Sequence, residues 1–404
     1  MFIAFAPLQG YTDAVYRLAH HECVGGVDEY YTPFVRIEHG EVRRKDLRDT
    51  DPERNVGVPT VPQVIASGGD EFARLCDALQ GQGWRRIDLN MGCPFPMQVR
   101  AGRGSGLLLY PDRIEEIQRE MLRRPEVAFS VKMRTGWESV DEGLSCMNII
   151  NAMPLVHVTL HPRLGRQQYK GMPDMEAFRR FCEACRHPMV YNGDIVQVEN
   201  GKWKVGNVDG TDITALFPDL KGVMLGRGLL ARPWMTACAG ETPASPIDAG
   251  ETPACPVDAG GTPAYPVDAG GTPAYPVDAG GTPAYQFDAG GTPAYQFDAG
   301  ETPAHPVDAG GTPAYPVDAG GTPAYQFDAG GTPAYPVLRS MHERIYRHAT
   351  ETLCGDSQIL ARLHAFWEYI DIPHKQKKSI LKATTLPRYR EAVSDVINRP
   401  DMFR

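Results

Sequence analysis

Eight strand-like runs alternate with helical patterns over the first 235 residues, and this alternation constrains the fold more than any other feature of the chain. The runs are at 2–7, 29–35, 59–65, 86–92, 129–136, 155–162, 188–194 and 222–228. Amphipathic helices are predicted between them, at 70–82, 111–123, 140–153 and 174–185. Repeated strand–helix units indicate parallel strands, and eight units in this length predict an α/β fold of the (β/α)8 TIM-barrel type.

An open, doubly wound sheet is the alternative architecture for such an alternation. It is disfavoured because no GxGxxG fingerprint follows the first strand. Residues 339–404 have apolar positions at helical spacing and predict a small all-α C-terminal domain. The expected organisation is therefore a catalytic barrel over 1–238, an insert over 239–338 and a helical domain over 339–404.

The insert consists of ten near-copies of a decapeptide, typically AGGTPAYPVD. This period is too short for a helical solenoid unit. Because of its proline and glycine, the repeat is expected to form no helices, and proline is expected to interrupt any strand ladder. The sequence predicts a disordered or polyproline-II-like segment. Two roles stay open: a spacing or protein-interaction segment, or a tolerated insertion at an exposed domain boundary.

The overall charge of −9 reflects the insert more than the folded parts. The insert holds nine Asp, three Glu and no Lys or Arg, so the rest of the chain has 38 acidic residues against 41 basic ones. A slightly basic remainder is compatible with a polyanionic partner. The start of the chain has no secretory-signal pattern, and no apolar run is long enough to span a membrane. We expect a cytoplasmic protein with free thiols.

Polar residues end most of the predicted strands, which is where a barrel carries its catalytic groups. The last two strands end in the glycine-containing segments 192–194 and 226–228, whose backbone N–H groups can approach a phosphate. Arg227 can neutralise that phosphate. Lys132 can stabilise a reduced cofactor anion, and the Gln63 amide suits the pyrimidine edge of a flavin. This set favours FMN over a dinucleotide.

Cys93 follows Asn90, Met91 and Gly92 at the end of the fourth predicted strand. The glycine-rich stretch 100–106 follows and is expected to be mobile and to close over a substrate. A cysteine in this position can act as nucleophile or proton donor. The alternative is a buried, inert thiol. The Gly-Cys-Pro setting beside Asn90 favours a catalytic role.

One CxxC pair, Cys182 and Cys185, precedes His187. Its spacing is that of one helix face, and a zinc site would need a second pair of ligands, which the sequence does not provide. We expect no metal.

Taken together, these motifs resemble the tRNA-dihydrouridine synthase family. APLQGYTD (6–13) is similar to the family's opening, and DLNMGCPFPMQVRAGRGSGLLL (88–109) to its catalytic-loop signature. VKMRTGW, LHPRLGRQQYKG, YNGD and GVMLGRGLLARPW follow in the family's order. The resemblance covers 1–235. It continues more weakly into 339–404, where RLHAFWEYI is similar to the family's helical tRNA-binding domain.

The resemblance implies an oxidoreductase acting on CH–CH groups, with FMN at the barrel mouth, NADPH as electron donor and tRNA as substrate. A hydride would pass from flavin N5 to C6 of a uracil, and Cys93 would donate the proton to C5. The bacterial C-type subfamily, which the chain resembles, acts on uridine 16 of the D-loop. The base must be turned out of the tRNA fold and stacked on the flavin. Nothing in the sequence requires more than a monomer.

The resemblance also assigns site positions. Those that match flavin contacts are Pro7, Leu8, Gln9, Gln63, Lys132, His161, Asn192, Gly193, Asp194, Gly226 and Arg227. Those that match substrate contacts are Arg36, Asn90, Arg134 and Arg163.

The chain departs from the family's pattern at two places. Leu8 stands where the family commonly has Met, a volume-conserving change that should be mild. The repeat separates two domains that the family joins directly. If those domains did not dock, affinity for tRNA would fall while the flavin site stayed intact.

Two rival functions remain on sequence grounds. One is a flavin barrel that reduces a small molecule, as dihydroorotate dehydrogenases do, although it leaves the basic helical tail unexplained. The other is a non-catalytic RNA-binding or folding factor, which the presence of Cys93, Lys132 and His161 argues against.

Overall fold

The computed structural model describes residues 1–199, 202–205, 212–237, 284–287, 293–296 and 334–398. Contacts divide the chain into two compact units. One is Met1–Glu241 together with Ala334–Arg404, and the other is Thr242–Pro333. The division into three domains stays a prediction.

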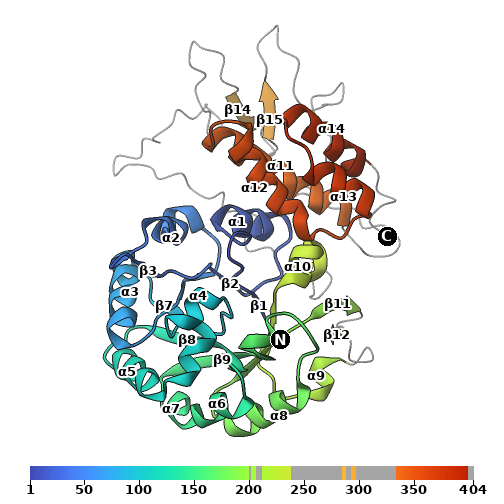
Figure 1. Ribbon diagram of the computed structural model, residues 1–404. Coiled ribbons are helices and arrows are strands. Elements are labelled where there is room, and N and C mark those ends of the chain that lie inside the picture. Colours follow the sequence, from blue (N-terminus) through green and yellow to red (C-terminus); the bar gives the residue numbers. More distant parts are fainter. Residues whose placement is uncertain (200–201, 206–211, 238–283, 288–292, 297–333, 399–404) are drawn as a thin grey trace. The chain divides into compact units, whose positions relative to one another are not determined.

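The first unit contains a parallel barrel, as the strand–helix alternation predicts (Figure 1). Neighbouring strands follow the order β5-β2-β1-β13-β10-β9-β8-β7-β6. Their bounds are β1 (Phe2–Phe5), β2 (Glu29–Tyr31), β5 (Thr60–Val61), β6 (Gln63–Val64), β7 (Arg86–Met91), β8 (Ala128–Gly136), β9 (Leu155–Leu164), β10 (Met189–Asn192) and β13 (Gly222–Leu225). Each pairing is parallel.

Pro62 explains why nine strand segments form an eight-stranded barrel. It lies between β5 and β6, and its missing N–H interrupts the ladder. β5 pairs with β2 and β6 pairs with β7, so the two halves of this one strand join the ends of the sheet. The eight predicted runs are thereby confirmed. The run 29–35 is shorter than predicted, because β2 ends at Tyr31, two residues before Pro33.

The helices of this part of the chain mostly surround the barrel, and the short helix after β7 lies inside the ring that they form (Figure 1). They are α1 (Ala14–Cys23), α2 (Arg44–Asp49), α3 (Gly69–Gly81), α4 (Pro96–Arg100), α5 (Pro111–Leu122), α6 (Val140–Ser145), α7 (Met147–Asn151), α8 (Met175–Ala184), α9 (Ile213–Leu216) and α10 (Arg227–Ala231). Short 3-10 helices are η1 (Pro52–Asn55), η2 (Gly104–Leu109), η3 (Gly165–Gln167) and η4 (Pro233–Thr236). The helix predicted over 140–153 divides at Cys146, which ends α6 and begins α7.

Two hairpins extend the strand ends. β3 (Ile37–Glu38) pairs with β4 (Glu41–Val42), and β11 (Ile195–Glu199) pairs with β12 (Lys202–Val205). Neither was predicted from the sequence.

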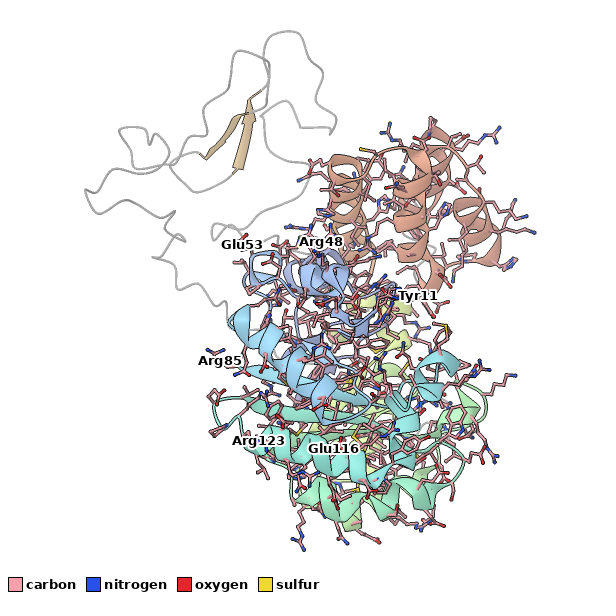
Figure 2. The ribbon with its side chains drawn as sticks, turned by 60° about the vertical axis from the view of Figure 1, so that its left-hand side comes forward. Tyr11, Arg48, Glu53, Arg85, Glu116 and Arg123 are labelled. Atoms are coloured by element: carbon pink, nitrogen blue, oxygen red, sulfur yellow. The ribbon has the colours of Figure 1, made fainter. Side chains whose placement is uncertain are left out.

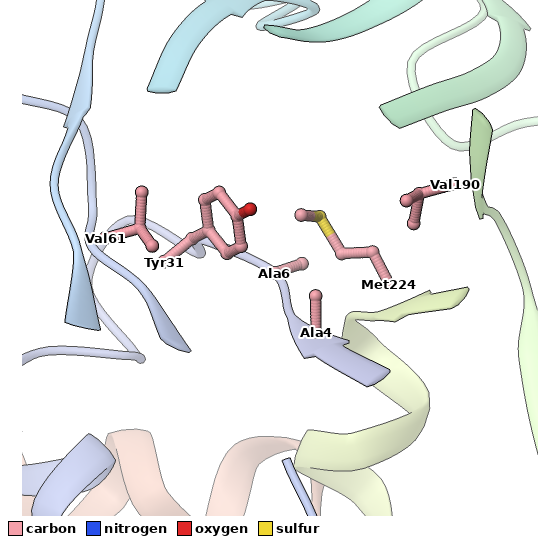
Figure 3. Close-up of a cluster of buried hydrophobic side chains, with 6 residues drawn as sticks. All are labelled: Ala4, Ala6, Tyr31, Val61, Val190 and Met224. Carbon is pink, nitrogen blue, oxygen red and sulfur yellow. The ribbon is translucent and has the colours of Figure 1, made fainter. Parts of the chain in front are cut away.

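The barrel interior is apolar on one side and polar on the other. Alternate residues of a barrel strand face inward. On one side they form a buried cluster of Ala4, Ala6, Tyr31, Val61, Val190 and Met224 (Figure 3). On the other side, β6 to β9 carry buried Gln63, Asp88, Asn90, Ser130, Arg134, Thr159 and His161. The two sides of the interior therefore differ in polarity, and the second side holds the groups that can take part in chemistry.

Four helices follow the repeat, as predicted: α11 (Ala334–Thr352), α12 (Asp356–Tyr369), α13 (His374–Leu381) and α14 (Leu386–Ile397). Their centre is a buried aromatic group around Tyr389, whose hydroxyl lies 2.8 Å from Trp367 Nε1 and 2.8 Å from His342 Nε2. α11 begins at Ala334, inside the last copy of the repeat and ahead of the predicted boundary at 339.

The helical segment packs against the barrel within the same unit. Met341 and Ile345 of α11 are fully buried, and α11 contacts α1 and η4. Arg362 Nη2 donates to Asp13 Oδ1 at 2.6 Å, and Asp13 also caps α1. The Tyr11 hydroxyl donates to Glu368 at 2.9 Å, and Figure 2 shows Tyr11 beside the C-terminal helices. An apolar and hydrogen-bonded contact therefore joins the two segments across the repeat.

Most of the repeat, which we predicted to be disordered, lies outside the described residues. Within it, β14 (Ala284–Phe287) pairs antiparallel with β15 (Pro293–Gln296). This pair corrects the expectation that proline prevents strand pairing throughout the repeat. Both strands include a position where Gln replaces the usual second proline, Gln286 and Gln296. That substitution restores a backbone N–H donor.

We expect the barrel and the helical segment to stay folded together when residues 242–333 are replaced by about ten Gly and Ser residues. The chain enters the repeat from η4 and leaves it into α11, and these two elements contact each other. Shortening a loop whose ends are already close lowers the entropy cost of closing it by about 2 kcal/mol at most. The melting temperature should stay level or rise. A fall of more than about 5 °C would mean that the repeat contributes packing.

Candidate functional site

The polar side of the barrel is organised in layers by strand register. The lowest layer consists of Gln63, Asp88 and Ser130, which are opposite one another on β6, β7 and β8. The next consists of Asn90, Lys132 and Thr159, and the third of Arg134 and His161. The layers lead toward the carboxyl ends of the strands, where barrel enzymes hold their substrates.

A directed chain of hydrogen bonds links the lowest layer to the one above. Ser130 Oγ donates to Asp88 Oδ1 at 2.6 Å, and Gln63 Nε2 donates to Asp88 Oδ2 at 2.7 Å. Asn90 Nδ2 donates to Gln63 Oε1 at 2.7 Å. The Gln63 amide is thus partly engaged within the protein, and its remaining N–H and lone pair are what it can offer a ligand.

Cys93 is held through its backbone on both sides. Asn90 Oδ1 accepts the N–H groups of Gly92 at 3.0 Å and Cys93 at 2.8 Å. The Cys93 carbonyl accepts from the backbone N–H of Ser105 at 3.1 Å and from its hydroxyl at 3.0 Å. Gly104 has φ +60°, and a Cβ there would lie 2.6 Å from the Cys93 carbonyl oxygen. In this structure the glycine-rich stretch is a packed support for Cys93.

Burial sets the protonation of the two central groups, Cys93 and Lys132. It raises the pKa of the Cys93 thiol, an effect opposed by a backbone hydrogen bond and by nearby Arg134 and Lys132. Burial, reinforced by Arg134, lowers the pKa of Lys132 to about 8. The thiol is therefore protonated near neutral pH, while Lys132 is mostly cationic. A neutral acid beside a cation can donate a proton and then have its anion stabilised.

Some polar atoms of this region lack a partner among the described residues. Thr159 Oγ1 and Arg163 Nε are buried without a hydrogen bond. Within the described ranges, Lys132 has no carboxylate within 4.0 Å. Buried polar groups are normally satisfied. This interior therefore suits a polar, planar ligand with both donors and acceptors, which describes the pyrimidine part of a flavin.

A charged cluster lies where β9, β10 and β13 end. Arg163, which is 1% exposed, pairs with the Asp194 carboxylate, and Arg227 Nη2 approaches Asp194 Oδ1 at 3.1 Å. Arg163 Nη1 is 3.0 Å from His161 Nε2. A guanidinium only donates, so Nε2 accepts and the ring proton is assigned to Nδ1. Burial, with the nearby cations, holds the pKa of His161 well below its ordinary value.

The cluster carries two arginines for one carboxylate, and this surplus of positive charge suits a phosphate. Asp194 has φ +36°, and Gly193 before it has φ 157°. Gly226 precedes α10, and Asn192 Nδ2 donates to the Met224 carbonyl at 2.8 Å. These segments are at the predicted phosphate corner.

Three further predicted residues follow β1. Pro7 and Leu8 are half-buried, and the Leu8 N–H donates to Thr12 Oγ1 at 2.8 Å. Gln9 is exposed, and its Nε2 lies 3.3 Å from the Phe34 carbonyl. Arg36 lies beyond β2 and pairs with Glu38 at 3.1 Å. No described hydrogen bond or ion pair joins Arg36 to the rest of the predicted set.

Tyr169 is the site residue that sequence reasoning missed. It is 48% exposed, and its ring faces Arg227 at 4.3 Å and Arg134 at 5.4 Å. An exposed aromatic ring can stack on a base, and the two nearby guanidinium groups add positive charge. The sequence signal was present in LHPRLGRQQYKG, but no spacing rule brings residue 169 to these arginines.

The described cysteines, seven in all, carry free thiols. No group of His, Cys, Asp or Glu among the described residues is arranged to hold a metal ion. No helix of the described part is long and apolar enough to cross a membrane.

Comparison with known proteins agrees with this geometry. The model of the dihydrouridine synthase (Dus) family matches residues 4–255. tRNA-dihydrouridine synthase B of Pasteurella multocida is 28% identical over 236 residues, which are 58% of this chain and 67% of that protein. tRNA-dihydrouridine(16) synthase of Neisseria meningitidis serogroup A is 30% identical, over 57% of this chain and 68% of that protein. The Pseudomonas putida protein of the same name is 29% identical, over 58% and 71%.

The chain belongs to the dihydrouridine synthase family, a class of oxidoreductases, and the three relatives named above are bacterial. A second model, the Spt5 C-terminal nonapeptide repeat binding Spt4, matches residues 279–352. That match covers a minor part of the chain, mainly the repeat. The family match ends before α11, so the role of the helical segment remains a proposal.

Proposed function

We propose that this enzyme reduces the C5–C6 double bond of a D-loop uridine in tRNA, with FMN at the barrel mouth and NADPH as electron donor. The observation that carries the proposal is Cys93, a protonated thiol fixed beside an unsatisfied polar barrel interior. Relatives in Neisseria and Pseudomonas are named for position 16, and this supports uridine 16 as the target.

The described residues fit FMN. Lys132, Gln63 and Thr159 would face the ring. Thr159 Oγ1 has no hydrogen bond, and the Gln63 amide keeps one N–H and one lone pair beyond its bonds to Asp88 and Asn90. Arg227 and the glycine segments around Gly193 and Gly226 would hold the phosphate. When bound, FMN supplies the hydride that is added to C6 of the uracil.

Cys93 would donate its Sγ proton to C5 of the uracil. The bonds then balance: a C–H bond forms at C6 from the hydride, a C–H bond forms at C5 from the proton, and the double bond is lost. The thiolate left behind is stabilised by Lys132 and Arg134 and regains a proton from water. Both hydrogens add to one double bond, so no leaving group is needed.

Asn90, Arg134 and Arg163 would bind the uracil, and Tyr169 would stack near it. Arg134 Nη1 already donates to the Leu164 carbonyl at 2.9 Å, which orients the guanidinium and leaves other N–H groups for the base. The base must leave its stack to reach this interior, at a cost that RNA-binding contacts elsewhere must offset.

The helical segment would supply some of those contacts. Its basic residues gather on α13 and the start of α14: Lys375, Lys377, Lys378, Lys382, Arg388 and Arg390. A surface depression of about 580 Å³ between these helices is lined by Lys382 and Arg388, but also by Glu391 and Asp395. The first turns of α13 and α14 carry basic residues and suit the RNA backbone better than the depression, which holds both basic and acidic residues.

The function is tested with purified protein, FMN, NADPH and unmodified tRNA, followed by digestion and mass spectrometry of the nucleosides. We expect dihydrouridine at one D-loop position and none when Cys93 is removed. Turnover of free uridine or orotate without tRNA would favour the small-molecule flavin enzyme. Binding of tRNA by a protein that never binds flavin would favour the non-catalytic factor.

Lys132→Met should weaken FMN binding by roughly tenfold at pH 7, because it removes a buried cation from beside the ring. The wild-type pKa of about 8 adds a pH signature. Lys132 is charged below that value, so wild-type affinity should fall as the pH rises through about 8. The variant should show no such fall. Flavin fluorescence titrations measure both, and equal affinities at pH 7 would contradict the assignment.

A further inference from the structure

We propose that Asp88 is a positioning residue that sets the direction of the Gln63 and Asn90 amides and thereby fixes the backbone of Cys93. Asp88 is fully buried in the middle of β7 and reaches neither the barrel mouth nor Cys93 directly. Its importance for catalysis rests on the proposed function. The hydrogen-bond chain itself can be tested without turnover.

An amide side chain has nearly the same shape after a half-turn, so shape alone does not decide which end is oxygen. Asp88 removes that ambiguity for Gln63. An ionised carboxylate only accepts, so the Gln63 atom at 2.7 Å from Asp88 Oδ2 must be Nε2. Gln63 Oε1 then faces Asn90, so the Asn90 atom that contacts it must be the donor Nδ2.

Asn90 is left with Oδ1 pointing at the loop. That oxygen accepts the N–H groups of Gly92 and Cys93, which are the first residues of the loop. The reverse polarity would put the Asn90 NH₂ group against two N–H donors, and the loop would lose its anchor. The Asp88 carboxylate therefore sets the direction of two amide side chains and, through them, of the loop at Cys93.

The surroundings of Asp88 favour this role over ion pairing. The charged or titratable groups that face it are Arg86 on the same strand, Lys132 on β8 and Tyr31 on β2. None of the described ion pairs includes Asp88. Its two oxygens are taken up by Ser130 and Gln63. A buried carboxylate with only neutral partners is costly, and its acceptor-only chemistry is what an amide in its place would lack.

The test is a cycle of nearly isosteric variants: Asp88→Asn, Asn90→Asp and the double variant. Asn90→Asp alone places carboxylates at both ends of Gln63, whose amide can donate to only one of them. The double variant restores a satisfied chain of reversed polarity, in which the new amide at position 88 donates to Gln63 and Gln63 donates to the new carboxylate at position 90. Asp88→Asn alone offers Gln63 either an acceptor or a donor, so the direction of the chain is no longer fixed, and we expect a change in the same sense as Asn90→Asp but smaller. The described hydrogen bonds join the side chains of residues 88 and 90 only through Gln63. Recovery of stability in the double variant would therefore show that the chain of hydrogen bonds couples the two positions.

Two properties of each holoenzyme variant are measured. They are its melting temperature and the rate at which iodoacetamide alkylates Cys93, with exposed Cys354 as the internal reference. We expect Asn90→Asp to melt roughly 8 °C lower and to be alkylated roughly tenfold faster at Cys93, with Cys354 unchanged. The double variant should recover most of both changes. A double variant as impaired as Asn90→Asp, or more so, would overturn the proposal.

Catalysis is tested separately with Asp88→Leu. Reoxidation of reduced flavin by tRNA, which needs Cys93 in place, should slow by roughly tenfold, while reduction of flavin by NADPH stays within about threefold. Equal loss in both half-reactions would mean a general structural role and overturn the catalytic part. If Asp88→Leu does not fold, the isosteric cycle still decides. Absence of dihydrouridine with the wild-type enzyme would instead reject the proposed function and leave the alkylation result standing.

Discussion

Replacing Cys93 by Ala is expected to slow the tRNA-dependent step by at least about a hundredfold and to leave flavin binding and flavin reduction by NADPH within about twofold. The thiol is the protonated acid beside Lys132, and its removal leaves C5 of the uracil without a positioned proton donor. The loop should survive the change, because Asn90 and Ser105 hold the backbone of residue 93 and not its side chain. Stopped-flow absorbance of the flavin measures each half-reaction.

The matched control is Cys354→Ala, an exposed thiol of the helical segment. It should leave both half-reactions unchanged. The pH dependence of the wild-type rate is a further test. Burial raises the pKa of the Cys93 thiol, so the rate of the tRNA-dependent step should stay constant across neutral pH and fall only above the ordinary pKa of a thiol. A Cys93→Ala enzyme that reduces tRNA at the wild-type rate would remove Cys93 from the mechanism.

Asp194→Asn is expected to lower the free energy of unfolding by about 3 kcal/mol, or the melting temperature by roughly 6–10 °C. Arg163 is 1% exposed, and the substitution leaves its charge buried without a counter-ion. Asparagine tolerates the positive φ of residue 194 about as well as aspartate, so backbone strain does not confuse the result. Thermal unfolding at saturating FMN measures the change.

Asp371→Asn is the control for this prediction. Asp371 pairs with Arg232 at 2.9 Å, but the two side chains are 59% and 43% exposed. An exposed pair contributes about 1 kcal/mol at most. Equal effects of the two substitutions would mean that the Arg163–Asp194 pair is not a buried ion pair in solution.

Much of the fold could be predicted because each barrel strand is an apolar run between helical patterns. All eight runs are strands, and the helices at 70–82 and 111–123 differ from α3 and α5 by a residue or less at each end. Features that depend on distant contacts escaped prediction. α11 begins at Ala334, ahead of the predicted boundary at 339, and Val337 and Leu338 near its start are buried. The hairpin β11–β12 is a different case, because Asn200 and Gly201 between its two strands are a local turn signal that could have predicted it.

Some residues of the candidate site could likewise be predicted from local sequence, and others could not. Strand-end residues such as Lys132 and His161 could be predicted, because polar side chains at the end of an apolar run stand out. Asp88 could not, because it sits inside the run and only the fold places it against Gln63 and Ser130. Tyr169 is brought to Arg134 and Arg227 by the long connection after β9, which no local pattern describes.

The proposed function requires this enzyme to make dihydrouridine in tRNA with Cys93 as proton donor. The most direct measurement is a mass-spectrometric map of tRNA nucleosides from cells that lack the gene, complemented with the wild-type gene or with Cys93→Ala. We predict dihydrouridine at one D-loop position, uridine 16, with the wild-type gene and unmodified uridine there with the variant. The same map in all three strains, with no dihydrouridine position gained or lost, would contradict the proposed function.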